Sequence, residues 1–106
     1  MTLTPKFLGG ATLGTEATIY TAPAGNTVRI EHIVISNGST AGTVTVKFRD
    51  SSSSTDYELL NGVTIEANGV LELADIILEA GDSIRASAAT TTGAKITIFG
   101  VENDNS

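Results

Sequence analysis

The segment that most constrains this chain is residues 27–37, with the sequence TVRIEHIVISN. Its first half alternates, with Val28 and Ile30 on one face and polar side chains on the other. Its second half is apolar at each of residues 33–35, so both faces carry apolar groups there. A period of two residues indicates a β-strand, and apolar groups on both faces indicate a strand covered on both sides. We therefore expect this segment to be the central strand of a small all-β domain.

Shorter segments of the same kind follow along the chain. Residues 43–49 and 95–101 alternate apolar and polar side chains, and turn residues separate such segments throughout. In residues 70–78 the alternation changes phase after Asp75, which indicates a bulge or a corner, whereas a short helix fits the neighbouring pattern less well. About eight short strands with frequent turns are typical of an antiparallel β-sandwich or a small barrel.

The 106 residues suit one domain. We expect residues 1–14, with Pro5 and isolated apolar residues, to form an N-terminal arm. This arm is either a strand along the edge of a sheet, which we favour, or a swapped arm. Residues 15–102 should form the β-sandwich, and the polar residues 103–106 a flexible tail.

Charge and composition limit the classes of molecule that this chain could bind. The net charge of −6 and the pI near 4.5 argue against binding to nucleic acid or to anionic membranes, which require basic patches. They favour solubility, or a partner that carries basic patches. The chain has no cysteine, and we expect neither a signal peptide nor a membrane span because no apolar run is long enough.

No chemistry is recognisable in the sequence. His32 is the single histidine and lies in the central strand, where a hydrogen-bonded structural role needs fewer partners than catalysis. The twelve acidic residues lack the spacing of a calcium loop, and Asp75 and Asp82 fit turns. The serines of residues 51–54 lack a nucleophile-elbow pattern. We expect no catalytic, cofactor-binding or metal-binding residues, and we expect that the protein is not an enzyme.

Apolar side chains lie on strand faces that are expected to be exposed to solvent. Phe99 and Val101 alternate out of phase with the apolar residues before them, and Ile33 and Ile35 lie opposite Val34. Such groups indicate either a covered subunit interface or a packing phase that changes at a bulge. The candidate interface residues, including two from the N-terminal arm, are Phe7, Leu8, Ile33, Ile35, Phe99 and Val101.

Three stretches carry a resemblance to a known group of proteins. They are YTAPAGNTVRIEHIVISNGSTAGTVTVKF (residues 20–48), LELADIILEAGDSIRASA (71–88) and KITIFGVE (95–102). Together they resemble small virion proteins of tailed bacteriophages, capsid decoration (cement) proteins in particular. The shared pattern consists of turns and alternating strands and covers about three quarters of the chain.

This resemblance implies a jelly-roll-like β-sandwich with a structural role and no catalytic residues. We expect a decoration protein, a homotrimer, that binds the major capsid protein or another virion protein on the outside of the head. A tail- or fibre-associated structural or receptor-binding module is the alternative. The expected localisation is the virion, after assembly in the host cytoplasm.

Overall fold

The computed structural model describes residues 2–88 and 93–104, and within these residues every regular element is a β-strand. No helix in the described part of the chain is long and apolar enough to span a membrane. The eight strands are β1 (Thr2–Thr12), β2 (Ala17–Thr21), β3 (Asn26–Ser36), β4 (Gly42–Asp50), β5 (Thr55–Ile65), β6 (Val70–Leu78), β7 (Ser83–Ala88) and β8 (Lys95–Asp104).

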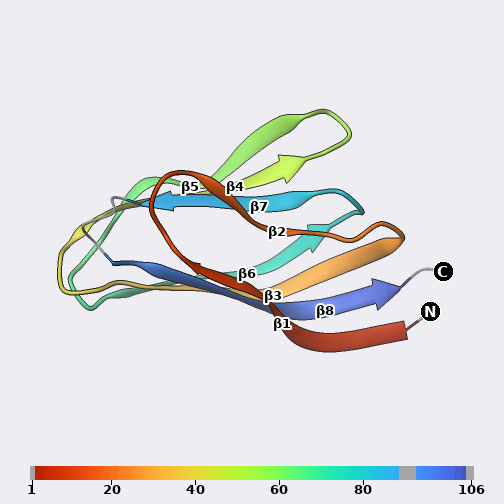
Figure 1. The fold of residues 1–106 in the computed structure, drawn as a ribbon, viewed down its shortest axis with the longest axis horizontal. Coiled ribbons are helices and arrows are strands. Elements are labelled where there is room, and N and C mark those ends of the chain that lie inside the picture. The colour runs from red at the N-terminus through yellow and green to blue at the C-terminus, as the bar shows by residue number, and fades with distance from the viewer. Residues whose placement is uncertain (1, 89–92, 105–106) are drawn as a thin grey trace.

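The strands form two four-stranded antiparallel sheets, with the orders β1-β8-β3-β6 and β2-β7-β4-β5 (Figure 1). The first strand pairs with the last, the second with the seventh, the third with the sixth and the fourth with the fifth. These four pairings are those of one long hairpin folded over on itself. Two further pairings, β3 with β8 and β4 with β7, connect the strand pairs within each sheet. The predicted jelly-roll β-sandwich is therefore confirmed.

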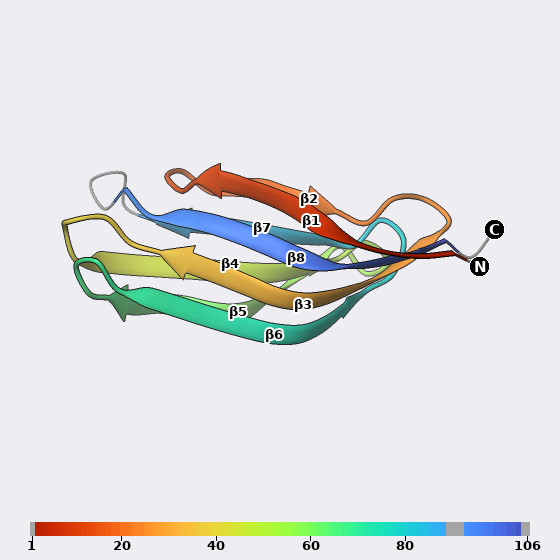
Figure 2. The same cartoon turned by 90° about the horizontal axis from the view of Figure 1, so that it is seen from below.

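The core lies between the sheets and is almost entirely aliphatic. Figure 1 shows the two sheets as separate layers, and Figure 2 shows them face-on, with the β1-β8-β3-β6 sheet in front, β1 and β2 at one edge and β5 and β6 at the other. Because the chain has few aromatic residues, branched aliphatic side chains fill the interior. The large side chains that are fully buried are Val28, Ile30, Ile33, Ile35, Val44, Val46, Ile65, Leu78, Ile84, Ile96 and Ile98.

A row of extra residues crosses the β1-β8-β3-β6 sheet at the level of Phe99 in β8. The pairing of β1 with β8 skips Leu8, and the pairing of β3 with β8 skips Glu31. The pairing of β3 with β6 skips Glu31 and Asp75, and Asp75 has a positive φ of 57°. The phase change predicted at Asp75 is thus confirmed, and a corresponding change occurs in β3.

The bulge in β3 corrects one part of the sequence prediction. Ile33 and Ile35 lie in the core, with 0% and 1% of their surface exposed, and the half-buried Val34 lies on the outer face. An extra residue at Glu31 shifts every later side chain of the strand to the opposite face. His32 is therefore on the outer face, not on the side of Val28 and Ile30.

The first and last strands pair with each other. Residues 2–12 of the expected arm form β1, the edge strand that pairs with β8 along its length, which is the alternative favoured from the sequence. Strand β8 continues to Asp104, so the expected tail shortens to residues 105–106, which lie outside the described residues. Strand β5 is continuous from Thr55 to Ile65, and its pairing with β4 shifts register near Gly62, which has a positive φ of 58°.

Candidate interaction surfaces

The outer face of the β1-β8-β3-β6 sheet carries an aromatic pair. Phe7 of β1 lies opposite Phe99 of β8, and their rings meet edge to face with centroids 5.9 Å apart. The two side chains remain 57% and 43% exposed. Because aromatic rings bury large apolar areas at interfaces, an exposed pair on a sheet face indicates a surface that another molecule covers.

The bulge at Leu8 positions this pair. Leu8 turns inward and packs against the core, whereas Phe7 before it points outward. Gly100 makes room for this arrangement, because a Cβ atom there would collide with the carbonyl oxygen of Arg29 and lie 3.0 Å from Leu8 Cδ1. The expected interface residues Phe7 and Phe99 are therefore exposed, whereas Leu8 belongs to the margin of the core.

An open hollow continues this surface toward β6. Val101 of β8 and Ile77 of β6 line it from either side of Arg29, together with Thr27 and Asn103. The side-chain oxygen of Asn103 is buried without a hydrogen-bond donor within the described structure. An unpaired buried acceptor of this kind costs free energy.

Paired charges surround the apolar groups on this face. Arg29 donates to Asp75 Oδ1 at 3.0 Å, and His32 Nδ1 lies 2.6 Å from Glu72 Oε1. Both pairs are exposed. Exposed pairs of this kind contribute little to stability. Among the described residues, Glu72 is the acidic partner of His32, so the arrangement is that of an exposed hydrogen-bonded pair.

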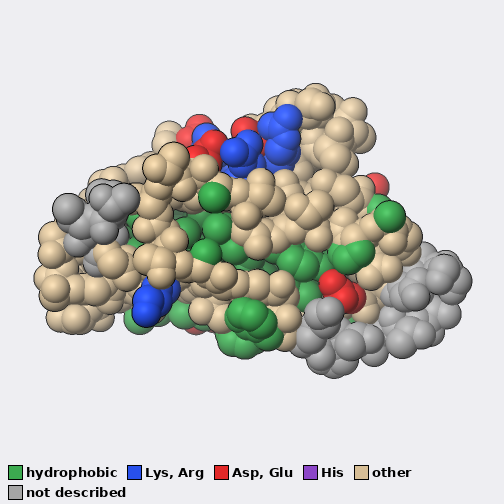
Figure 3. Space-filling view, in the orientation of Figure 1, with side chains coloured by type: hydrophobic (Ala, Val, Ile, Leu, Met, Phe, Trp, Pro, Cys, Tyr) green, Lys and Arg blue, Asp and Glu red, His purple; other side chains and the backbone are tan. Residues whose placement is uncertain are grey.

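The outer face of the β2-β7-β4-β5 sheet differs, because ion pairs bridge its strands. Glu16 accepts from Lys47 at 2.7 Å and lies 3.4 Å from Arg85, and Arg49 donates to Asp56 at 3.0 Å. Figure 3 shows acidic and basic side chains together along the upper margin of the view, while hydrophobic side chains break the surface at the lower margin. One outer face is therefore bridged by ion pairs, although Arg85 Nε is buried there without a hydrogen-bond partner among the described residues, and the other carries the aromatic pair.

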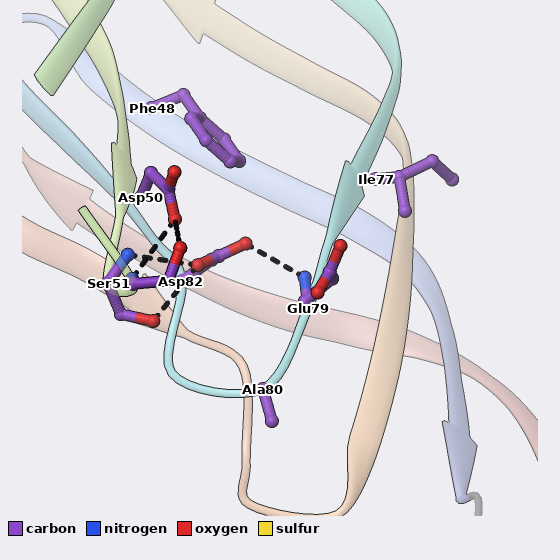
Figure 4. A pocket seen from close by; sticks show the side chains of 8 residues that line it. Phe48, Asp50, Ser51, Ile77, Glu79, Ala80 and Asp82 are labelled. Atoms are coloured by element: carbon purple, nitrogen blue, oxygen red, sulfur yellow. Dashed lines mark hydrogen bonds between the residues drawn. The ribbon is translucent and has the colours of Figure 1, made fainter. Parts of the chain in front are cut away.

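Carboxylates concentrate at one end of the sandwich. Asp82 is buried and accepts hydrogen bonds from the backbone N–H of Ser51 and of Glu79, both at 3.0 Å (Figure 4). Asp50 accepts from the hydroxyls of Ser52 and Ser53, and these hydrogen bonds lower the pKa of its carboxyl group. These contacts fix the β4–β5 loop against the β6–β7 turn.

Glu102 lies at this same end, because both it and Leu78 pair with Val28. It accepts a hydrogen bond from the Tyr20 hydroxyl at 2.7 Å, which links the two sheets. Burial and this carboxylate raise the pKa of Tyr20. Among the residues that the structure describes, no group of three or more His, Cys, Asp or Glu side chains is arranged to hold a metal ion. The acids therefore give this end a negative charge without forming a recognisable reactive centre.

Sequence reasoning missed the exposed apolar groups at the β5–β6 edge. Tyr57 and Ile77 are 53% and 54% exposed, and Leu59 and Val70 are exposed on the same two edge strands. The adjacent apolar residues Ile76 and Ile77, directly after the predicted bulge, were a usable signal, because only one of two neighbours can face the core.

Comparisons with known proteins give a likeness of fold. No family model and no curated protein matches the sequence. Among solved structures, the NLP core of Drosophila is similar, with a TM-score of 0.50, 14% sequence identity, and coverage of 92% of this chain and 99% of that chain. The NLP core structure was described in terms of pentamer formation and histone binding. At this identity the likeness shows the fold that the two chains share.

These comparisons contradict the expected relation to phage virion proteins. The similar structure is a histone-binding, pentamer-forming core, so the capsid-decoration function, the tail or fibre alternative, the homotrimer and the capsid partner are all corrected. The residues behind the resemblance explain the error. They are turn residues and alternating strand residues, which this sandwich requires for folding whatever it binds. The virion localisation stays an untested prediction.

Proposed function

We propose that this chain is a non-enzymatic subunit of a closed homo-oligomer that binds a basic protein. The observation that carries the proposal is the exposed apolar surface around Phe7 and Phe99 in a protein whose opposite face is polar. A monomer that left this surface in water would forgo its burial, which contributes roughly 25 cal/mol per Å². Five subunits are proposed by analogy with the NLP core.

The charge of the chain supports a basic partner. Each subunit carries a net charge of −6, and Asp50, Glu79, Asp82 and Glu102 lie at one end of the sandwich. An oligomer multiplies this charge and presents the same end several times, so that a partner with several basic segments binds with avidity. The NLP core, which shares the fold, is described as binding histones, which makes a histone a suitable probe.

Two measurements test the proposal separately. Sedimentation or light scattering of the purified protein should give a mass near five subunits, and a monomer at micromolar concentration would refute the assembly. Titration with core histones should show binding that weakens steeply with added salt, because the interaction is electrostatic. An oligomer that does not bind histones even at low salt would refute the partner.

Paired variants locate the binding end. Glu79→Gln removes one exposed charge at the acidic end, and Glu66→Gln removes an exposed charge from the turn between β5 and β6. Both change the net charge by the same amount. We expect Glu79→Gln to weaken histone binding several-fold more than Glu66→Gln does. Equal effects would show that net charge alone, not this end, attracts the partner.

A further inference from the structure

The chain contains three Asn-Gly sequences, at residues 37–38, 61–62 and 68–69. Such a sequence is chemically labile, because the backbone nitrogen of the glycine can attack the side-chain amide carbon of the asparagine, and glycine has no Cβ atom to obstruct the approach. The attack needs an asparagine side chain that can turn toward that nitrogen. It also needs a glycine N–H that can leave its hydrogen-bond acceptor. The fold gives the three sequences different freedom in both respects.

The side chain of Asn37 is held in place by its own amide group. Its Nδ2 donates to the backbone oxygens of Thr40 and Glu66, both at 2.9 Å, and to that of Ile65 at 3.4 Å. These contacts join the end of β3 to the loop before β4 and to the β5–β6 turn. Cyclisation would expel this nitrogen as ammonia and would break all three hydrogen bonds. The fold therefore protects Asn37.

At Asn68 the turn restrains the attacking nitrogen instead. The N–H of Gly69 donates to the backbone oxygen of Glu66 at 2.9 Å, and the N–H of Asn68 donates to that of Gly38 at 2.7 Å. The turn is tight, since a Cβ atom on Gly69 would lie 2.9 Å from the same Glu66 oxygen. The nitrogen of Gly69 is thus directed into the turn, and its release requires the turn to open.

Asn61 has neither form of protection. Asn61 and Gly62 form a β-bulge in β5, where the two residues oppose Thr45 of β4 and neither has a partner in the register. The N–H of Gly62 donates at 3.0 Å to the side-chain hydroxyl of Thr45, which can rotate away, and not to a backbone oxygen. The side chain of Asn61 is exposed and makes no hydrogen bond to another residue that the structure describes. Both requirements of the attack are therefore met at this site.

We propose that Asn61 is a site of spontaneous modification in the folded protein, with water as the second reactant. The nitrogen of Gly62 bonds to Cγ of Asn61, the bond from Cγ to Nδ2 breaks, and ammonia leaves with the proton lost by the Gly62 nitrogen. Water then opens the cyclic imide at either of its carbonyl carbons. The products are an aspartate in the normal main chain and an isoaspartate, which inserts a methylene group into the main chain. Each product gains one negative charge.

The bulge can accept either product. Asn61 and Gly62 already lie outside the register of the β4–β5 pair, so the change there disturbs the single hydrogen bond from Gly62 to Thr45. Strand β5 is also an edge strand, which leaves room for a longer main chain on its open side. We therefore expect the modified protein to stay folded. The reaction needs neither an oligomer nor a partner, so it is independent of the proposed function.

Peptide mapping by mass spectrometry tests the assignment. The natural protein is incubated in mildly alkaline buffer, and the loss of amide at each Asn-Gly sequence is followed with time. In the folded protein Asn61 should react about ten-fold faster than Asn37 or Asn68, because opening one or two hydrogen bonds slows a reaction by about that factor. In urea the three rates should become similar, because each asparagine precedes glycine. Faster reaction at Asn37 or Asn68 in the folded protein would overturn the assignment, and so would an unchanged order of rates in urea.

Two variants test the part played by the Thr45 hydroxyl. Thr45→Ala removes the acceptor of the Gly62 N–H and should raise the rate at Asn61 several-fold, with the rate at Asn68 unchanged. Thr45→Ser keeps a hydroxyl and is the matched control, which should react like the natural protein. An unchanged rate at Asn61 in Thr45→Ala would contradict the restraint assigned to this hydrogen bond. An equal increase at Asn68 would show a general loosening of the fold and would contradict a local effect.

Discussion

The two outer faces of this sandwich are built from the same strand geometry and differ in how their side chains are satisfied. On the β2-β7-β4-β5 sheet, Lys47 and Arg85 share Glu16, so charged groups have partners within the subunit. On the β1-β8-β3-β6 sheet, the rings of Phe7 and Phe99 contact each other and remain partly exposed. The first face is bridged by ion pairs within the subunit, whereas the second leaves both aromatic rings partly exposed. Whether an outer face can bind a partner therefore depends on which of its side chains remain exposed or unpaired within the subunit.

The largest expected effect on stability tests which residues of the β1-β8-β3-β6 sheet face the core. Ile33→Ala should lower the free energy of unfolding by about 2–5 kcal/mol, because it leaves a cavity in the core. Val34→Ala, at the next position on the outer face, should cost about 1 kcal/mol or less. Urea denaturation of both variants measures the difference. Equal losses would contradict the phase shift at Glu31.

A smaller effect is expected on the polar sheet. Glu16→Gln removes both ion pairs of that carboxylate, and the side chains involved are partly exposed to water. We expect a loss of stability well below that of Ile33→Ala, detectable at low salt and absent at high salt. Denaturation midpoints at two ionic strengths provide the test. A loss that persists in high salt would show that this face depends on packing as well as charge.

The smallest effect concerns the acidic end. The pKa of Asp50 is lowered by hydrogen bonds from Ser52 and Ser53, so the folded state favours its ionised form. Its contribution to stability is therefore present above its ordinary pKa of 3.8 and is lost as the pH falls through the lower folded value. Asp50→Asn should be slightly less stable than the natural protein at pH 6, and the gap should close at acidic pH.

Thermal unfolding of the two proteins across this pH range measures the effect. Glu66→Gln serves as the control, because it removes a carboxylate from a turn at which no such hydrogen bonds to the side chain are described. A gap that stays constant down to acidic pH would contradict the stabilisation of the ionised form.

Much of the fold could be predicted from the sequence. Strands of period two, separated by turns, determine an antiparallel sandwich, and the phase change at Asp75 was visible because apolar residues resume one position late. A change of phase at a bulge was one of the two explanations offered for Ile33 and Ile35, but its position in β3 was not predicted, although the consecutive polar residues Glu31 and His32 were a signal for it. Because the bulge was not located, Ile33 and Ile35 stayed among the candidate interface residues, whereas the structure buries both in the core.

The sequence by itself determined an acidic, cysteine-free, all-β domain and identified Phe99 and Val101 as out of phase with the core. Tertiary structure decided that Phe7 joins Phe99, that Leu8 turns inward, and that β5 and β6 form a second exposed apolar edge. The physical reason is that strand periodicity is local, so it is written in consecutive residues. Pairing between residues 7 and 99 depends on how distant strands align, and one bulge changes which side chains meet.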